Sequence, residues 1–197
     1  MGRIVVTEFV SLDGVMEDPG GSEGTQHGGW SFEFDRGPEG DKFKLDETVS
    51  SEALLLGRVT YEGFAAAWPS REGEFADKFN TMPKYVVSST LRDPEWENST
   101  VLGGDVVGEV ERLKRELEGD IVVHGSARLA QTLIEHDLVD ELRLMVFPIV
   151  LGSGKRLFVE ASDKKSLRLV DSKVVGAGVA ILVYAPAAAN EKEPAAG

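Results

Sequence analysis

Two short runs of consecutive apolar residues, each followed closely by glycine and a helical pattern, constrain the fold of this chain most strongly. The first run is residues 53–56 (ALLL) before Gly57, and the second is residues 121–123 (IVV) shortly before Gly125. A strand that is apolar on both faces is typical of the interior of a parallel sheet with helices on both sides. We therefore expect a three-layer α/β/α domain with crossover connections.

The rest of the pattern extends this sheet. Residues 167–175 and 179–185 are predicted to be strands joined by the turn 176–178, so this C-terminal hairpin is antiparallel and the sheet is mixed but mostly parallel. One domain is expected over residues 1–185, followed by a tail, residues 186–197, with the composition of a disordered segment. Other strands are predicted at 3–10, 85–88, 99–102 and 139–146, and helices at 41–51, 58–68, 74–81, 106–117 and 127–136.

Charge and cysteine content exclude several classes of protein. The formal net charge of -13 opposes binding to nucleic-acid phosphates and to anionic lipid, so neither is an expected partner. No apolar run approaches the roughly 18 residues that cross a bilayer. The chain has no cysteine, which rules out disulfides and thiolate chemistry and favours a cytoplasmic location.

Several short motifs match known patterns without the context those patterns need. Residues 20–24 (GGSEG) match a nucleophile elbow but lie in a glycine-rich loop, not between a strand and a helix. Residues 162–165 (SDKK) match a serine–lysine hydrolase string without its partner motifs. No metal site is expected, because the chain has only three histidines, none at metal-ligand spacing: His27, His124 and His136. The glycine fingerprint of Rossmann domains is also missing.

Three junctions between a predicted strand and the segment after it carry small, hydroxyl or basic residues. Ligands of open α/β sheets gather outside the carboxyl ends of the strands, where helix N-termini present free amides that suit phosphate. Each junction alone is more often a helix cap than a binding site, but together they favour an anionic ligand. The three sets are Gly57, Arg58 and Thr60; Ser88, Ser89 and Thr90; and Gly125, Ser126, Ala127 and Arg128.

Five runs in this order resemble a known family: FVSLDGVM, LLLGRVTYEGF, KYVVSSTL, IVVHGSARLAQTLIEHDLVDEL and PIVLGSGKRLF. They are similar to the C-terminal reductase domain of the bifunctional riboflavin-biosynthesis deaminase/reductase, and the similarity covers about residues 3–185. The resemblance implies a dihydrofolate-reductase-like fold, an NADPH cofactor and a homodimer. It also implies that the first junction set holds cofactor phosphates, the second lies near the adenosine and its 2′-phosphate, and the third covers the pyrophosphate and nicotinamide.

The expected function is an NADPH-dependent reductase that transfers hydride to a C=N or C=O group of a small, cyclic substrate, such as a pteridine, a pyrimidine or a riboflavin precursor. The proton donor is predicted to be Asp46 on the helix over 41–51, though solvated helix charges at Asp41, Asp46 and Glu47 are an equal alternative. Asp13 either acts on substrate or shapes a turn. The alternative function is a nucleotide-binding or sensing module with the same fold and no turnover.

Two features bear on the substrate and on assembly. Apart from Arg36, Lys42 and Lys155, the chain lacks the basic set that a phosphoribosyl substrate requires. The loop that carries Trp30 and Phe32 favours a flat apolar or aromatic substrate, unless these rings serve packing alone. For a homodimer, the apolar strands at 142–149 and 179–183 are either the interface or part of the core.

Overall fold

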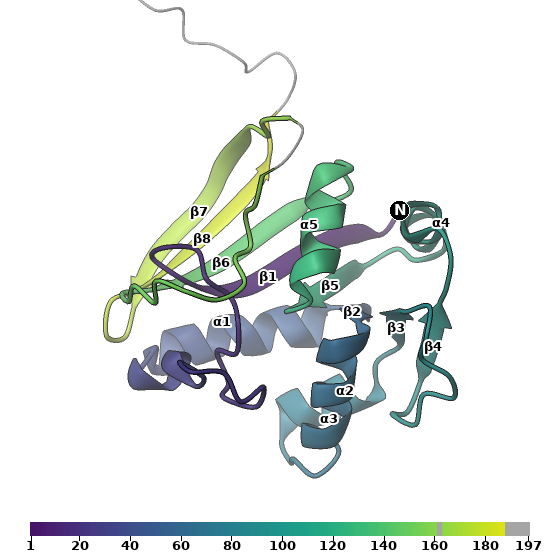
Figure 1. Ribbon diagram of the computed structural model, residues 1–197, viewed down its shortest axis with the longest axis horizontal. Coiled ribbons are helices and arrows are strands. Elements are labelled where there is room, and N and C mark those ends of the chain that lie inside the picture. Colours follow the sequence, from purple (N-terminus) through teal and green to yellow (C-terminus); the bar gives the residue numbers. More distant parts are fainter. Residues whose placement is uncertain (161–162, 188–197) are drawn as a thin grey trace, which may run out of the picture.

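The computed structural model describes residues 1–160 and 163–187 and contains one mixed sheet of eight strands (Figure 1). The strands lie in the order β4-β3-β2-β5-β1-β6-β8-β7. Their bounds are β1 Arg3–Ser11, β2 Ala53–Gly57, β3 Lys84–Val87, β4 Ser99–Leu102, β5 Asp120–His124, β6 Glu141–Phe147, β7 Leu167–Val175 and β8 Val179–Pro186. The helices are η1 Trp30–Glu33, α1 Gly37–Ser50, α2 Arg58–Ala67, α3 Glu74–Thr81, α4 Val106–Glu116 and α5 Ala127–Glu135.

The pairing of the strands confirms the predicted fold class. Strands β1 to β6 pair in parallel, whereas β8 runs antiparallel to both β6 and β7. The predicted domain boundary at residue 185 falls one residue before the end of β8, and the Ala187 amide donates a hydrogen bond to the Ser166 carbonyl. Residues 188–197 of the predicted tail, and Ser162 of the SDKK string, lie outside the described residues.

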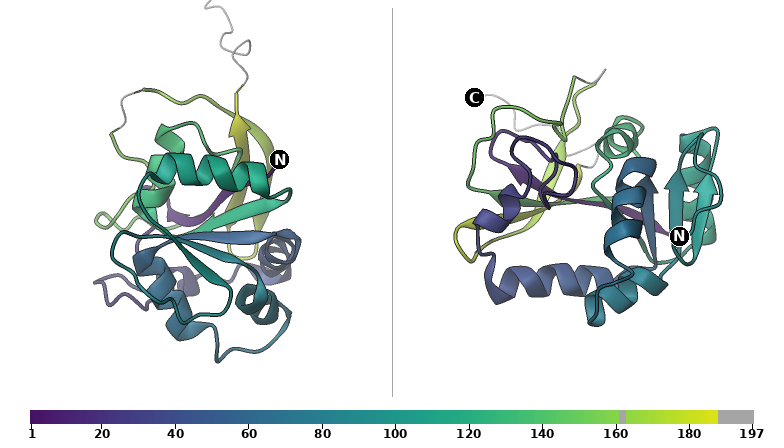
Figure 2. Two further views of the ribbon diagram at one scale, coloured as in Figure 1. Left: turned by 90° about the vertical axis from the view of Figure 1, so that its right-hand side faces the viewer. Right: turned by 60° about the horizontal axis from the view of Figure 1, so that its bottom comes forward.

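Helices α1, α2 and α3 lie on one side of the sheet, and α4 and α5 lie on the other (Figure 2). Alternate side chains of each strand supply the two cores, as the pleat of a strand requires. Val5, Leu54 and Val122 pack with Tyr61 and Phe79 on the first side. The residues between them face the second side and pack on α4 and α5: Ile4, Val6, Ala53, Leu55, Ile121 and Val123, with Val110, Leu113, Leu129 and Leu133.

The connections that follow β5 and its two neighbours leave the sheet toward opposite faces. After β1 and β2 the chain passes to helices on the first side, but after β5, which lies between them, it passes to α5 on the second side. Two connections that leave neighbouring strands toward opposite sides open a crevice at the carboxyl ends of those strands. By this rule a ligand-binding crevice is expected at the carboxyl ends of β1, β5 and β2, and this region is called the crevice below.

The loop between β1 and α1 is packed on the sheet. Trp30 is buried, its Nε1 donates to the Glu17 carbonyl, and its ring meets Phe147 edge-on at 5.4 Å. Helix α1 begins at Gly37, four residues before the predicted start, because Pro38 occupies its first turn, where the missing amide is not needed. Among the described residues, no helix is both long and apolar enough to span a bilayer.

Candidate functional site

The start of α2 and the start of α5 are joined by a reciprocal pair of hydrogen bonds. The Gly57 amide donates to Ser126 Oγ at 2.8 Å, and the Ser126 amide donates to Thr60 Oγ1 at 3.0 Å. Gly125 has a φ of +58°, and a Cβ there would lie 3.2 Å from the Thr60 side chain, so this close approach favours glycine. The structure thus brings together four predicted site residues from two separate segments.

Both helices begin at this junction with uncapped amides. Gly57 and Ser126 are the N-cap residues of α2 and α5, and in the described structure neither places a side chain on the first turn of its own helix. Ser126 adopts a left-handed conformation with a φ of 60°, which a serine adopts only when its surroundings hold it. Free first-turn amides and the positive end of each helix dipole suit an anion, and two such ends meet here.

The basic residues of the junction are accessible. Arg58, the first residue of α2, pairs with Glu62 through two 2.9 Å bonds on the exposed helix surface. Arg128 is exposed in the first turn of α5, next to the half-buried Ala127. An exposed ion pair adds little stability, so Arg58 can leave Glu62 for a phosphate.

The second predicted set, Ser88, Ser89 and Thr90, lies at the end of β3, which pairs with β2 at Val87 and Gly57. Ser88 Oγ accepts hydrogen bonds from the Thr90 and Leu91 amides, so Ser88 itself shapes the turn. The hydroxyls of Ser89 and Thr90 are on exposed residues of that turn. Ser88, Ser89 and Thr90 therefore lie beside the junction, at the carboxyl end of the neighbouring strand.

Asp46, the predicted proton donor, does not face the sheet. Asp46 lies on the solvent side of α1, where both of its carboxylate oxygens bind Lys42, and Asp41 binds Arg36 in the same exposed way. The helix instead buries Lys44, Glu47 and Thr48. Glu47, one of the alternatives, is therefore no solvated charge, because it faces the sheet.

A buried ionic cluster surrounds Glu47. Its carboxylate pairs with Lys44 and, at 3.2 Å, with Arg143 of β6, while Lys44 also donates to Thr7 Oγ1 at 3.0 Å. Burial raises the pKa of Glu47, but the charges of Lys44 and Arg143 and the bond from Lys44 outweigh it, and the pKa falls below its usual value. Thr7 is level with His124 and Arg143 in the sheet.

His124 ends β5 beside this cluster and is held neutral. Burial, assisted by the charges of Lys44 and Arg143, lowers the pKa of His124 to about 3. The Nε2 atom is buried without a hydrogen-bond partner among the described residues, and the ring meets Phe79 edge-on at 5.5 Å.

Glu8 is the functional candidate that sequence reasoning missed. It lies on β1 at the opposite face from Lys44, only 5% exposed, and its Oε2 accepts the Gly125 amide at 3.0 Å. Its Oε1 is buried with no hydrogen-bond partner in the described structure. Burial raises the pKa of Glu8 well above its ordinary value. The sequence did contain an indication, because Glu8 is the one acidic residue in the mostly apolar strand RIVVTEFVS.

Asp13 has the environment of a structural turn. Its carboxylate accepts hydrogen bonds from the Ser11 hydroxyl and from the amides of Leu151 and Gly152, and these bonds lower its pKa far below the ordinary value. Arg156 donates to its carbonyl at 3.0 Å. A carboxylate that stays ionised and fully bonded holds two loops together, which supports the turn alternative for Asp13 over proton transfer.

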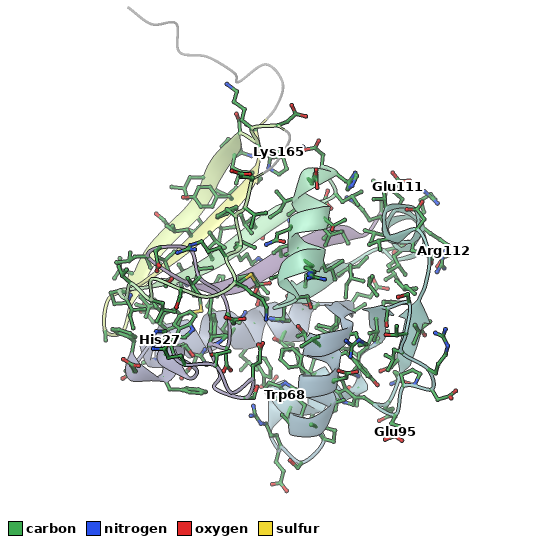
Figure 3. All side chains as sticks on the ribbon, in the orientation of Figure 1. His27, Trp68, Glu95, Glu111, Arg112 and Lys165 are labelled. Carbon is green, nitrogen blue, oxygen red and sulfur yellow. The ribbon has the colours of Figure 1, made fainter. Side chains whose placement is uncertain are left out.

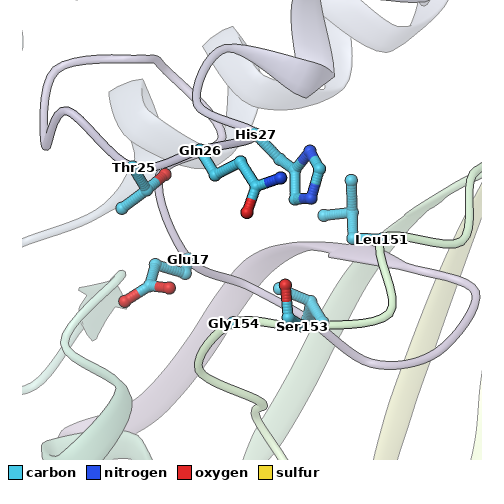
Figure 4. A pocket seen from close by; sticks show the side chains of 8 residues that line it. Glu17, Thr25, Gln26, His27, Leu151, Ser153 and Gly154 are labelled. Atoms are coloured by element: carbon cyan, nitrogen blue, oxygen red, sulfur yellow. The ribbon is translucent and has the colours of Figure 1, made fainter.

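Two cavities lie away from the junction. One of about 70 Å³ separates the loop of Thr25 and His27 from the loop of Leu151 and Ser153, and it has room for a few waters only (Figure 4). Figure 3 shows His27 among the loops at the periphery of the molecule. The larger cavity, of about 710 Å³, lies between α5 and residues 157–160 and 163–167 and is lined by none of the predicted site residues.

Known proteins share both the sequence pattern and the fold. The sequence matches the RibD C-terminal domain over residues 3–181. It is 30% identical over 188 residues to the uncharacterized protein YyaP of Bacillus subtilis, covering 92% of this chain and 94% of that protein. The fold superposes on a putative riboflavin biosynthesis protein from Shewanella with a TM-score of 0.76 at 21% identity, over 94% of this chain and 99% of that one.

A dihydrofolate reductase from Enterococcus faecalis complexed with NADP(H) superposes with a TM-score of 0.56 at 18% identity, over 93% of this chain and 96% of that one. At these identities the two solved structures establish the fold, which is that of dihydrofolate reductase. The sequence match spans almost all of the described strands and both halves of the junction. The chain is a member of the RibD C-terminal domain family.

Proposed function

We propose that this protein is an NADPH-dependent reductase that transfers hydride to a C=N or C=O carbon of a small cyclic substrate. The observation that carries the proposal is the junction of two uncapped helix N-termini at the crevice between β1, β5 and β2. A dinucleotide has a pyrophosphate that such paired helix ends stabilise. Family membership and the NADP(H) of the dihydrofolate reductase neighbour support this choice of cofactor.

Several residues of this chain fit the cofactor. The first-turn amides of α2 and α5 would hold the pyrophosphate, and the Arg58 guanidinium would add a charge-assisted hydrogen bond to a phosphate oxygen. Ser89 and Thr90, beyond the end of β3, would meet the adenosine side and its 2′-phosphate. When bound, NADPH supplies the hydride, and the protein orients the ring and excludes water.

Glu8, in place of Asp46, is our candidate for the carboxyl group that holds a proton at the site. Since Oε2 accepts the Gly125 amide, the proton of the neutral acid resides on Oε1, the oxygen without a partner. A neutral Glu8 also adds no negative charge beneath the anionic cofactor, whereas an ionised one would repel it. Neutral Glu8 would therefore favour the binding of NADPH and hold a proton near the crevice.

The exposed aromatic ring of the β1–α1 loop bears on the substrate, whereas the basic residues do not. Arg36 pairs with Asp41, Lys42 with Asp46, and Lys155 with Glu17 in exposed ion pairs of the kind that Arg58 makes with Glu62, so these pairs neither favour nor exclude a phosphate group. Trp30 is buried as packing, but Phe32 of the same loop is 79% exposed. We therefore propose a flat heterocyclic substrate of the pteridine or pyrimidine kind.

The first experiment is a titration of the purified protein with NADPH and NADH, followed by nicotinamide fluorescence. Saturable binding with NADPH preferred is the expected result, and Arg58→Ala should weaken it by about 1–3 kcal/mol because a charge-assisted bond is lost. Arg112→Ala is the matched control, because Arg112 makes the same exposed pair with Glu116 on α4, away from the junction.

Turnover separates the two functions that the fold allows. NADPH oxidation, followed by absorbance, is expected with at least one member of a panel of pteridines, pyrimidines and other cyclic C=N and C=O compounds. Binding of NADPH without oxidation across the panel would favour the alternative, a nucleotide-binding or sensing module. Failure to bind either nucleotide would overturn the cofactor assignment. A cytoplasmic location stays a prediction from the cysteine-free, acidic sequence.

A further inference from the structure

His124 is the last residue of β5 and therefore lies at the crevice. It is level with Thr7 of β1, so the two side chains project to the same side of the sheet, where Lys44 of α1 donates to Thr7 Oγ1 at 3.0 Å. The next residue along the chain, Gly125, belongs to the junction. The imidazole is thus a neighbour of the junction in the chain and of the buried ionic cluster in space.

The two ring nitrogens of His124 have different surroundings. Nε2 is buried without a hydrogen-bond partner in the described structure, while the residue as a whole is half-buried. Burial and the nearby positive charges lower the pKa of His124 to about 3, so the imidazole is neutral in the physiological range. A neutral imidazole carries one N–H donor and one acceptor nitrogen. The position of its single proton therefore decides what the ring offers to a ligand.

The buried charges favour a proton on Nδ1. Of the charges that shift the pKa of the imidazole, that of Lys44 has the largest effect, Glu47 opposes it, and Arg143 adds to it. A net positive field at the buried end of the ring stabilises a lone pair there and destabilises an N–H dipole. Nε2 is therefore the acceptor nitrogen, and the donor is Nδ1, the nitrogen that is free to meet a ligand.

The surfaces near the imidazole are aromatic. Phe79 of α3 meets the ring edge-on at 5.5 Å. Two residues after Thr7, on the same side of the sheet, β1 carries the half-buried Phe9, whose ring centroid lies 5.2 Å from that of Phe147. Sites for small ligands combine such apolar walls with a few polar groups. An N–H of His124 would be such a polar group, beside rings that suit a flat heterocycle.

We propose that His124 donates a hydrogen bond from Nδ1–H to the oxygen or nitrogen of the C=O or C=N group that is reduced. The inference rests on the proposed function. In that reaction the nicotinamide transfers hydride to the carbon, and the π electron pair moves to the oxygen or nitrogen, where His124 stabilises the developing negative charge. This atom then takes the proton for which Glu8 is the candidate, and solvent replaces it. The imidazole begins and ends the turnover neutral.

Lys44 is a positioning residue in this arrangement. A preorganised N–H donor in an enclosed site stabilises charge that develops in the transition state, because the donor is oriented before the reaction begins. The Lys44 ammonium does not touch the substrate, but its charge directs the imidazole proton to Nδ1. A lone pair close to a cation is stabilised even without a hydrogen bond, which accounts for the unpartnered Nε2.

The position of the proton can be measured without substrate or cofactor. Long-range ¹H–¹⁵N correlation spectra of the full chain, labelled with ¹⁵N-histidine, report which ring nitrogen is protonated, and the His124 signals are those missing from His124→Asn. The proton is expected on Nδ1, and Lys44→Met, which removes the ammonium, should move part of it to Nε2. A proton on Nε2 in the wild-type chain, directed at the Phe79 ring, would overturn the proposal whatever the turnover.

Three substitutions at His124 test the role of the donor. Asparagine places an amide nitrogen near the position of Nδ1, glutamine places one near Nε2, and phenylalanine removes both. With saturating NADPH and a compound that the wild type reduces, His124→Phe should lower kcat about 10²-fold, as loss of one preorganised donor does. His124→Asn should retain more activity than His124→Gln. The dissociation constant of NADPH should stay unchanged in all three variants.

His136→Asn is the matched control, because His136 is exposed at the opposite end of α5 from the junction. It should leave kcat unchanged, and circular dichroism should be the same for all variants. A His124→Phe variant with wild-type kcat, or a glutamine variant more active than the asparagine variant, would overturn this inference alone. Absence of turnover by the wild type with every compound would instead overturn the proposed function.

Discussion

Neighbouring residues on helix α1 have opposite environments, which the sequence did not reveal. Asp46 and Glu47 are both acidic, yet Asp46 is paired with Lys42 in solvent while Glu47 is buried between Lys44 and Arg143. The helical phase predicts which residues share a face, but a helix with charges on every face carries no apolar stripe to show which face is inward. The partner Arg143 lies 96 residues away, so its pairing with Glu47 is set by the tertiary fold.

Alanine substitution at these two positions should have very different effects on stability. Glu47→Ala leaves Lys44 and Arg143 buried without their shared carboxylate, and loss of about 3–5 kcal/mol in the free energy of unfolding is expected. Asp46→Ala removes one exposed helical pair and should change that free energy by less than about 0.5 kcal/mol. Urea unfolding at neutral pH measures both, and equal effects would contradict the burial of Glu47.

Glu8 should make stability depend on pH. Its pKa is raised by burial in the folded chain, so between the ordinary value of 4.5 and the folded value the folded protein holds a proton that the unfolded chain has lost. The contribution of Glu8 is thus fully present below pH 4.5 and is lost as the pH rises through the folded pKa. Each unit of pKa difference corresponds to about 1.4 kcal/mol.

Glu8→Gln removes this titration while keeping an oxygen for the Gly125 amide. The free energy of unfolding of the variant, relative to wild type, should therefore rise between pH 4.5 and pH 8, as measured by urea unfolding. His124 has the opposite pH dependence, but it is present in both proteins and cancels in the difference. Glu111→Gln on the exposed surface of α4 is the control. A difference that stays constant with pH would show that Glu8 is ionised in the folded protein.

At the scale of elements, the strands and their glycines were predictable and the bonds between elements were not. Runs such as residues 53–56 and 121–123 are apolar on both faces, and this property depends on the local sequence alone. The coupling of Ser126 to Gly57 and Thr60 joins segments almost 70 residues apart, which no local pattern encodes. The local sequence located the three junctions, but their hydroxyls were assigned to a ligand, although those of Thr60, Ser88 and Ser126 already accept hydrogen bonds from backbone amides.

Substitutions at Ser126 should separate the hydrogen bond from the backbone strain. Ser126→Ala leaves the Gly57 amide without its acceptor and keeps a left-handed residue, so a loss of about 1–3 kcal/mol is expected. Ser126→Gly loses the same bond but relieves the left-handed conformation, which is worth about 1 kcal/mol. Thermal and urea unfolding should place the glycine variant above the alanine variant. The reverse order would mean that the strain at Ser126 is absent in solution.

For the whole molecule, the order of strands and helices along the chain predicts the architecture better than any single motif does. The alternation of strands and helices predicted a mixed sheet with the C-terminal hairpin at one end, and this sheet is present. The side on which each helix lies follows from right-handed crossovers once the strand order is known. The sequence does not contain that order explicitly, so the crevice beside β5 was located from the structure.

A ligand at this crevice should stabilise the entire fold. The junction connects β1, β2 and β5 at the centre of one continuous sheet, so unfolding of any part destroys it. A ligand that binds only the folded chain adds about 2.7 kcal/mol at a hundred times its dissociation constant. For a chain of this size, each kcal/mol corresponds to about 2–4 °C of melting temperature, so saturating NADPH should raise the melting temperature by about 5–10 °C.

Differential scanning fluorimetry measures the shift in melting temperature. The shift should be smaller for Arg58→Ala, and for Arg112→Ala it should equal that of the wild type. A melting temperature that NADPH leaves unchanged would contradict binding at the junction.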